Sequence, residues 1–349
     1  MIVGVCGFGN TGSSAVSDYL KEFEDLCVLD NLEFGIICEP DGLADLAERL
    51  LRPKMRNLDS AVALLRYERK CRDFAAACRI RGGDGDRILR SLSAFLDSVT
   101  QARWYWRDRS EPQAGFVNTF LKRRLFARRI IPLAERLTGR PWTGWPRIRV
   151  GMSVMPDNFY EAACEHVRDM IEALGGSPDR TVVLDQPFGA NDPRAGFPFF
   201  RDPRAIVSDR DPRDLYVFAL TALRRSNSYM PLESPADFIT YYRALRQHQP
   251  YLTGEGILRV RFEDMVYDYE ATTARIRDFL GLGEDPRPGL WFDPARSVHN
   301  TRVFTRFPQY ADAVREIEEA LPEYLFDFDS YPPPEGRGPM FTGRTGRAT

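Results

Sequence analysis

The residues of this chain whose spacing suggests chemistry lie in a glycine-rich segment near the N-terminus. Gly7 to Gly12 read GFGNTG, and Ser13 and Ser14 follow directly. The apolar run IVGVC precedes this segment, and a stretch with helical spacing begins at Ser13. Glycines let a backbone approach an anion closely, and the first turn of a helix offers unpaired N–H groups at the positive end of the helix dipole. The sequence therefore predicts a phosphate-binding loop between a strand and a helix.

Two nucleotide-binding patterns overlap in this loop. GFGNTG fits the G-x-G-x-x-G of dinucleotide-binding enzymes, and Asp30, which closes the second expected strand, is placed to bind a ribose. The loop also matches most of G-x-x-x-x-G-K-[ST], but Ser13 stands where a lysine would neutralise the β- and γ-phosphates. These residues alone leave both patterns open, together with a plain β–α turn whose glycines bind nothing.

Two later blocks favour a third interpretation. AIVSDRDPRD (205–214) places a charged turn after an apolar strand, and ILRVRFED (257–264) places an acidic pair after another. Together with an N-terminal loop of the form x-[ST]-G-[ST]-[ST], and in this order, the blocks resemble the sulfotransferases that use 3′-phosphoadenosine 5′-phosphosulfate (PAPS). The resemblance covers about residues 1–285. It implies transfer of a sulfuryl group from PAPS to a hydroxyl by in-line displacement, with PAP as the product and no metal.

The resemblance also assigns the donor site residue by residue. It places the 5′-phosphosulfate on Gly9, Asn10, Thr11, Gly12, Ser13 and Ser14, and the 3′-phosphate on Arg210, with Arg302 in a later covering loop. The family usually has lysine or arginine where this chain has Asn10. As a catalytic residue, Asn10 can donate a hydrogen bond to the oxygen that leaves sulfur, but it carries no charge. Many members also place a serine where this chain has Phe218, so Ser208 and Ser226 are candidates to replace it.

Transfer to a hydroxyl needs a base close to the acceptor oxygen, and Glu33 is the candidate. Family members place a histidine or a glutamate shortly after the second strand, and this chain has no histidine before His166. Leu32 and Phe34 flank Glu33, so we expect it to be partly buried, with Glu39 and Asp30 as competitors. The residues expected to line the acceptor site are Asp185, Gln186, Asn191 and Trp104.

Five apolar runs are expected to position these residues as strands of one parallel sheet. They begin near residues 2, 26, 181, 205 and 257, and segments with helical spacing separate them. The prediction is a three-layer α/β/α fold with a central parallel sheet, like that of the P-loop nucleotide hydrolases. We expect one domain over residues 1–330, a helical insertion at about 55–150 without a convincing strand over 55–140, and a Pro/Gly-rich tail over 331–349.

Composition narrows the function classes further. The formal net charge of −2 gives no basic field for nucleic acid, and six cysteines without a C-x-x-C pair, with three histidines, predict no metal site. No apolar run approaches the roughly 20 residues of a membrane span, and we expect a cytoplasmic protein. The predicted partner is a hydroxyl acceptor, a carbohydrate or glycolipid, and the sequence leaves room for a homo-oligomer. The alternatives are an NAD(P)-dependent oxidoreductase using GFGNTG and a non-catalytic PAP- or PAPS-binding protein.

Overall fold

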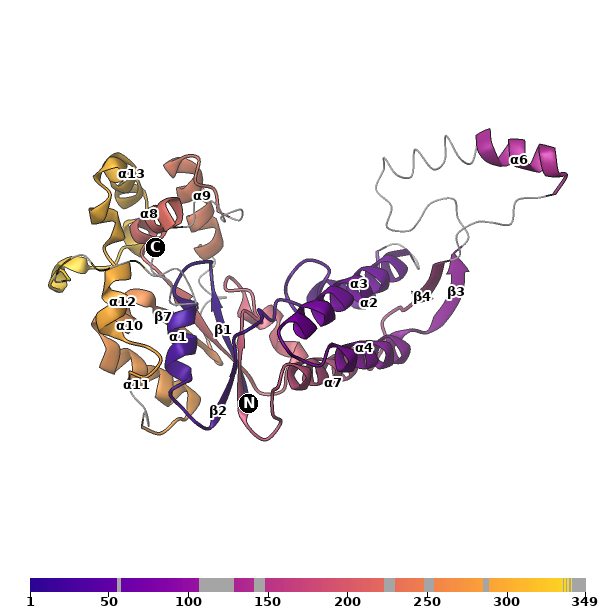
Figure 1. Cartoon of the computed structure of the whole chain (residues 1–349), viewed down its shortest axis with the longest axis horizontal. Helices are drawn as coiled ribbons and strands as arrows, with labels where there is room; N and C mark the ends of the chain where they lie inside the picture. Colours follow the sequence, from indigo (N-terminus) through magenta and orange to yellow (C-terminus); the bar gives the residue numbers. More distant parts are fainter. Residues whose placement is uncertain are drawn as a thin grey trace. The chain divides into compact units, whose positions relative to one another are not determined.

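The computed structural model describes residues 1–54, 58–106, 129–140, 148–222, 230–247, 254–284 and 289–334, together with 336, 338 and 340. The chain forms two compact units (Figure 1). Unit 1 comprises Met1–Phe34 and Gly176–Thr349, and unit 2 comprises Gly35–Gly175. Unit 2 therefore extends beyond both ends of the insertion that was expected at about 55–150.

Unit 1 is built on a five-stranded sheet with the strand order β2-β5-β1-β6-β7. The strands are β1 (Ile2–Gly7), β2 (Leu26–Leu29), β5 (Thr181–Asp185), β6 (Pro203–Asp209) and β7 (Ile257–Arg261). Every neighbouring pair is parallel. These are the five strands that the apolar runs predict, so the parallel α/β fold is confirmed. Because all the strands point the same way, their carboxyl ends share one edge of the sheet.

Helices flank this sheet and bury its central strand. They are α1 (Ser13–Leu20), α8 (Pro212–Ala222), α9 (Pro235–Arg246), α10 (Phe262–Tyr267), α11 (Tyr269–Leu280), α12 (Pro294–Ser297) and α13 (Ala311–Ala320). Val3 and Val5 of β1 share a core with α1 and α11. Gly4, between them, faces the other way, and a Cβ there would lie 2.4 Å from the Phe188 ring. A second core joins α8, α9 and α13, which lie together in Figure 1.

The strand order argues against the dinucleotide-binding alternative. In the dinucleotide fold the second strand of the chain lies beside the first. Here β5 lies between β1 and β2. That alternative also predicts a further strand soon after residue 35, whereas the next elements along the chain are the helices α2, α3 and α4.

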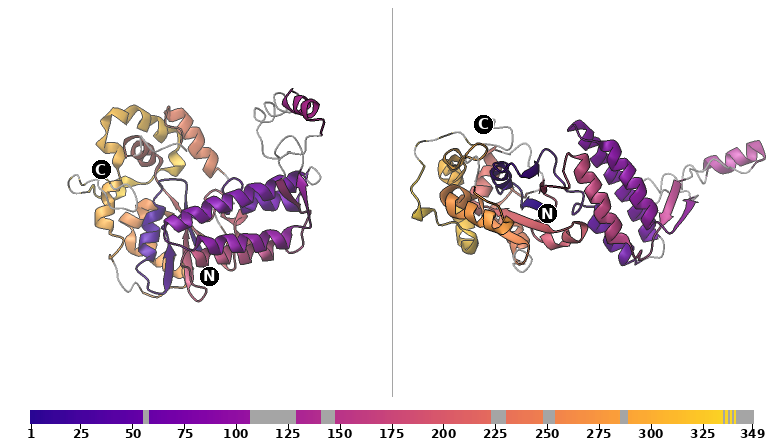
Figure 2. Two further views of the ribbon diagram at one scale, coloured as in Figure 1. Left: turned by 45° about the vertical axis from the view of Figure 1, so that its right-hand side comes forward. Right: turned by 90° about the horizontal axis from the view of Figure 1, so that it is seen from below.

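Unit 2 is mainly helical. Its elements are α2 (Leu43–Leu51), α3 (Leu58–Ile80), α4 (Gly85–Val99), β3 (Ala102–Trp106), α6 (Ile131–Thr138), β4 (Ile148–Met152) and α7 (Phe159–Ala173). Helices α3, α4 and α7 pack side by side, as both views of Figure 2 show. The Asp84 side chain caps α4 by accepting a hydrogen bond from Arg87 N at 2.9 Å. No helix among the described residues is both long and apolar enough to cross a bilayer.

The expectation of no strand over 55–140 was wrong at one place. Ala102–Trp106 forms β3, which pairs antiparallel with β4 (Ile148–Met152). The aromatic residues Trp104 and Tyr105 favour an extended backbone. The pairing partner lies beyond a long intervening segment, so the short run by itself did not stand out from the helical spacing around it.

A neutral histidine lies in the core of unit 2. His166 Nδ1 lies 2.7 Å from the Ser91 hydroxyl, and the imidazole stacks on Phe95 with ring centroids 5.1 Å apart. Burial lowers the pKa of His166 to about 3, although the nearby Asp169 carboxylate works in the opposite direction. Since the pKa of an unfolded histidine is about 6.5, folding favours the neutral imidazole.

This burial predicts that unit 2 loses stability in acid. The His166 contribution is present above about pH 6.5 and is lost as the pH falls toward 3, at up to about 1.4 kcal/mol per pH unit. Hydrogen exchange of α4 and α7 peptides, corrected for intrinsic rates, should show this loss between pH 6.5 and 4.5. In His166→Asn the starting stability is lower but the slope is smaller. An unchanged slope in that variant would contradict the assignment to His166.

Candidate functional site

The glycine loop leaves β1 at the carboxyl edge of the unit 1 sheet and enters α1. Gly9, Asn10 and Gly12 have φ values of 86°, 55° and 86°. A Cβ at Gly12 would lie 2.6 Å from the Phe262 side chain, so this position requires glycine for space as well as for conformation. The N-cap residue of α1 is Gly12, which has no side chain to cap the helix, and the first turn contains no acidic residue. The start of α1 is therefore suited to an anion.

Thr11 fixes the loop to the neighbouring strand β6. Its side chain is 1% exposed. The hydroxyl donates to Ser208 O at 2.8 Å and accepts from Phe8 N at 3.1 Å, while the Ser208 hydroxyl donates to Thr11 O at 2.5 Å. Both hydroxyls are thus engaged within the protein, including that of Ser208, which the sequence offered as a substitute phosphate ligand. Ser13 and Ser14, by contrast, are only half-buried.

Gln186 holds the loop from the other neighbouring strand. It follows β5 with a φ of 53°, and its backbone N donates to Val5 O at 2.9 Å. Its side-chain oxygen accepts from Gly7 N at 3.0 Å, and its side-chain nitrogen donates to the Ser13 hydroxyl at 3.2 Å. The sequence predicted Gln186 as an acceptor-site residue. The structure shows that its amide spans the two ends of the glycine loop.

A buried ion pair between Arg246 and Asp209 packs against Phe8 of the glycine loop. Arg246 of α9 is 0% exposed and donates to both carboxylate oxygens of Asp209, the last residue of β6, at 2.7–3.1 Å. Its guanidinium lies 4.0 Å from the centroid of the Phe8 ring and 3.5 Å from that of Tyr242. Sequence patterns did not indicate Arg246, because neither its spacing from Asp209 nor its position in a helix marks it as an ion-pair partner.

Arg210 is also buried, at 4% exposure, and it joins the glycine loop to a C-terminal loop. Its guanidinium donates to Asn10 O at 3.4 Å and to Asn300 O. It lies between two rings, 4.7 Å from the centroid of Phe218 and 5.2 Å from that of Phe262. Among the described residues, its Nε has no hydrogen-bond partner. Phe218 therefore stacks on the arginine at the position where the family often has serine.

Arg302 is directed toward the C-terminal segment. It has a φ of 51°, and its guanidinium donates to Phe328 O, to Tyr331 O at 2.6 Å and to the Tyr267 hydroxyl at 3.4 Å. In the present geometry it secures the start of the expected tail, of which positions 335, 337, 339 and 341–349 lie outside the described residues.

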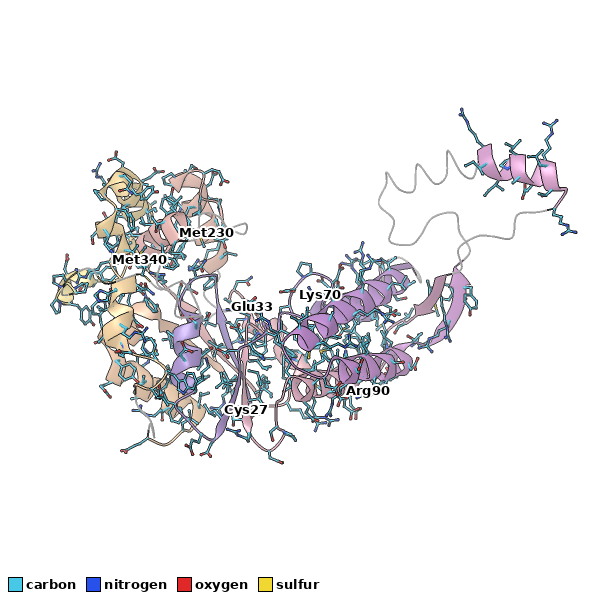
Figure 3. The ribbon with its side chains drawn as sticks, in the orientation of Figure 1. Cys27, Glu33, Lys70, Arg90, Met230 and Met340 are labelled. Atoms are coloured by element: carbon cyan, nitrogen blue, oxygen red, sulfur yellow. The ribbon has the colours of Figure 1, made fainter. Side chains whose placement is uncertain are left out.

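The predicted base and acceptor residues follow the ends of β2 and β5. Phe34 N donates to Asp185 O at 2.7 Å, which places the adjacent Glu33 beside the end of β5. Figure 3 labels Cys27 near the start of β2 and Glu33 beyond its end. Glu33 is exposed rather than partly buried as expected, because only its neighbour Phe34 enters the core. Asp185 is buried and Asn191 is exposed.

The remaining candidates lie elsewhere. Asp30 forms an ion pair with Lys21 at 2.7 Å. Glu39 belongs to unit 2 and pairs with Lys70 at 2.6 Å. Trp104 is half-buried on β3 of unit 2. Ser226 lies outside the described residues.

Comparison with known proteins identifies the family. A family model described as "Sulfotransferase family" matches residues 3–286. The chain belongs to the sulfotransferase family. No curated protein gave a match. Similar solved structures include sulfotransferase STF9 from Mycobacterium avium, with 13% identity, 95% of this chain and 76% of that chain covered, and a TM-score of 0.36. Another is the sulfotransferase domain of the Synechococcus PCC 7002 olefin synthase, with 15% identity, coverages of 81% and 73%, and a TM-score of 0.33.

Within this sulfotransferase, two acids lie buried behind Arg210. Glu263 Oε1 accepts from Asp211 N at 2.9 Å, and Asp214 Oδ1 accepts from Phe304 N at 3.2 Å. The other carboxylate oxygen of each has no hydrogen-bond partner among the described residues. Burial raises the pKa of Glu263 to about 8 and that of Asp214 to about 7, against the opposing charge of Arg210. Glu263 thus caps a neighbouring turn, as its position after β7 suggests.

The raised pKa of Glu263 predicts a pH-dependent stability opposite to that of His166. Its contribution is complete below about pH 4.3 and is lost as the pH rises to about 8, at up to about 1.4 kcal/mol per pH unit. Glu263→Gln keeps an acceptor for Asp211 N but cannot ionise, so its unfolding free energy should fall less between pH 5 and 8 than that of the native chain. Denaturant unfolding at several pH values measures the difference. The exposed Glu323→Gln is the control, and an equal change there would exclude Glu263 as the source.

Proposed function

We propose that this sulfotransferase transfers the sulfuryl group of PAPS to a hydroxyl of a carbohydrate or glycolipid acceptor. The observation that carries the proposal is the start of α1 at the N-cap residue Gly12, entered by a glycine loop that Thr11 and Gln186 hold in place. Such a loop suits an anion whose charge is spread over several oxygens. The family membership supplies the reaction class.

The residues of the loop fit the 5′-phosphosulfate half of PAPS. In this proposal the backbone at Gly9 to Gly12 and the hydroxyls of Ser13 and Ser14 hold the phosphosulfate. The left-handed conformations of Gly9 and Gly12 and the absence of an acidic side chain in the first turn of α1 support this. Thr11 contributes through its backbone, since its hydroxyl is bound to Ser208 O.

Arg210 offers the positive charge that Asn10 lacks. Its guanidinium donates to the Asn10 carbonyl from behind the loop, at 3.4 Å. A fixed cation there stabilises negative charge that develops on the leaving phosphate oxygen. Arg210 is also the proposed ligand of the 3′-phosphate, which it reaches by exchanging its Asn300 carbonyl for a phosphate oxygen. A guanidinium is well suited to that exchange, because it binds phosphate through two parallel hydrogen bonds.

Glu33 is the proposed base. Its carboxylate accepts the proton of the acceptor hydroxyl while the acceptor oxygen bonds to sulfur. The bond from sulfur to the phosphate oxygen breaks, and the electron pair stays on PAP. Exposure of Glu33 at the end of β2 leaves its carboxylate accessible to an acceptor. Asp185, Asn191, Gln186 and Trp104 remain proposed acceptor residues, with Gln186 also positioning the loop.

The wider organisation follows from the same proposal. We place the sulfotransferase domain at residues 1–330, with unit 2 as its inserted part. All six cysteines lie among the described residues and none of them forms a disulfide, which suits a reducing compartment, and we propose a cytoplasmic location. A homo-oligomer is compatible with the proposal.

Glu33→Gln should abolish turnover without abolishing donor binding. Loss of the base lowers kcat by roughly 10²–10⁴-fold, whereas the affinity for PAP changes little, since Glu33 is not a donor-site residue. Turnover with PAPS and a panel of sugar and glycolipid acceptors, together with calorimetric titration of PAP, measures both. Asp30→Asn is the control and should stay active. Loss of activity in Asp30→Asn but not in Glu33→Gln would show that Glu33 is not the base. If the native chain binds PAP but shows no turnover, the protein is a non-catalytic PAP-binding protein.

Arg210→Lys should weaken PAP binding by roughly 10–100-fold, because lysine keeps the positive charge but cannot form the bidentate hydrogen bonds of a guanidinium to phosphate. Arg302→Lys is the matched variant and should have a smaller effect, since that guanidinium binds Phe328 O and Tyr331 O. Calorimetric titration of PAP compares the two, and the melting temperature reports folding. A native protein that binds NADH but not PAP would overturn the proposed function.

A further inference from the structure

Unit 2 contains a cavity of about 320 Å³ between α3, α4 and the ribbon formed by β3 and β4. The cavity is partly open to solvent, so a ligand can enter it from outside. Pockets that hold small organic molecules have volumes of roughly 300–1,000 Å³ and often lie between helices. The cavity falls at the lower end of that range.

The lining of the cavity is divided between leucines and polar side chains. Leu64 of α3 and Leu92 of α4 form its buried floor, at 5% and 3% exposure. Leu65, Leu89 and Leu96 are half-buried and line its sides. On α4, Leu89, Leu92 and Leu96 follow one another at helical spacing, so they form a continuous stripe. At about 1.5 Å of rise per residue the stripe is roughly 10 Å long, which suits a medium-length alkyl chain.

The rim of the cavity is charged, with one positive charge in excess. Arg72 pairs with Glu68 at 2.7 Å, and Arg103 pairs with Asp97. Arg149 of β4 is exposed and forms no hydrogen bond or ion pair with any described residue. It lies opposite Tyr105 and therefore on the same face of the ribbon as Arg103. Three arginines against two acids favour an anionic group at the rim.

The shape argues against a protein helix as the occupant. A helix with its side chains is about 10–12 Å across, which a cavity of about 320 Å³ does not accommodate. The β4 backbone also closes one end. A Cβ at Gly151 would lie 2.8 Å from Thr100 Cγ2 and 3.3 Å from Leu64 Cδ1.

We propose that this cavity binds a single medium-length alkyl chain with an anionic headgroup, the chain lying along the leucines and the headgroup at Arg149. The proposal is independent of the proposed function, because binding is measured without PAPS or turnover.

The test is calorimetric titration of the full-length chain with decanoate, 1-decanol and decyltrimethylammonium, which share one tail and differ in headgroup charge. We expect one molecule per chain and the order decanoate, then decanol, then the ammonium compound. Octanoate should bind about tenfold more weakly than decanoate, because each methylene transferred from water contributes about 0.8 kcal/mol. No decanoate binding, binding of many molecules per chain, or tighter binding of the ammonium compound would overturn the proposal.

Variants locate the site. Leu89→Trp fills the cavity and should abolish decanoate binding, with Leu65→Trp from the opposite wall as a second test should the first variant fold poorly. Ile80→Trp, at an 82% exposed position on α3, is the matched control and should bind normally. Retained binding in both filling variants, or equal loss in the control, would place the ligand elsewhere. A native dimer that Leu89→Trp dissociates would show instead that a second copy occupies the cavity.

A further pair tests the headgroup. Arg149→Gln should weaken decanoate binding by roughly 3- to 10-fold and leave decanol binding unchanged. Arg90→Gln, an exposed arginine of α4 that pairs with Asp84 and is labelled in Figure 3, is the control. A loss of decanol affinity equal to that of decanoate in Arg149→Gln would show that Arg149 does not select the charge.

Discussion

The candidate site depends on the burial of the Arg210 guanidinium between two aromatic rings. Phe218 and Phe262 hold the guanidinium plane, while its N–H groups reach the Asn10 and Asn300 carbonyls. Burying a cation is costly. Glu263 and Asp214 lie close enough to Arg210 for its charge to oppose part of the rise in their pKa values that burial causes. The charged turn after β6 is therefore one connected cluster that contacts the glycine loop through Arg210.

Through this cluster, the end of strand β6 contacts both the glycine loop and the C-terminal segments of unit 1. Asp209 binds Arg246, whose guanidinium contacts the ring of Phe8 in the glycine loop. Asp211 binds Arg213 with its carboxylate, and Arg213 in turn reaches Phe326 O near the C-terminus. Alternate residues along the turn thus fix the loop and the C-terminal segments at the same edge of the sheet. That edge is where a parallel sheet collects its ligands.

Sequence patterns predicted the parts of the structure that depend on local signals. The five strands are short, buried and apolar, and the glycine loop must be left-handed where Gly9 and Gly12 stand. The remaining features depend on contacts between distant segments. From the sequence, Phe218 was interpreted only as the absence of the usual serine, because its contact with Arg210 depends on the folded structure. Likewise, no residue near Arg246 in the sequence indicates that it pairs with Asp209. Strand β3 escaped notice for the same reason, since its partner β4 lies far along the chain.

The position of the positive charge has a consequence for catalysis in this family member. A lysine side chain has a flexible stem, whereas the Arg210 guanidinium is held by two aromatic rings and by the Asn10 carbonyl. A fixed charge stabilises a transition state only where its distance is already correct, but it then costs no reorganisation during the reaction. In the proposed mechanism, sulfuryl transfer relies on the rigidity of the edge formed by β1, β5 and β6, where Thr11, Gln186 and Arg246 form the contacts that hold the loop. In that proposal the Arg210 guanidinium, next to the Asn10 backbone, takes the place of a charged side chain at position 10.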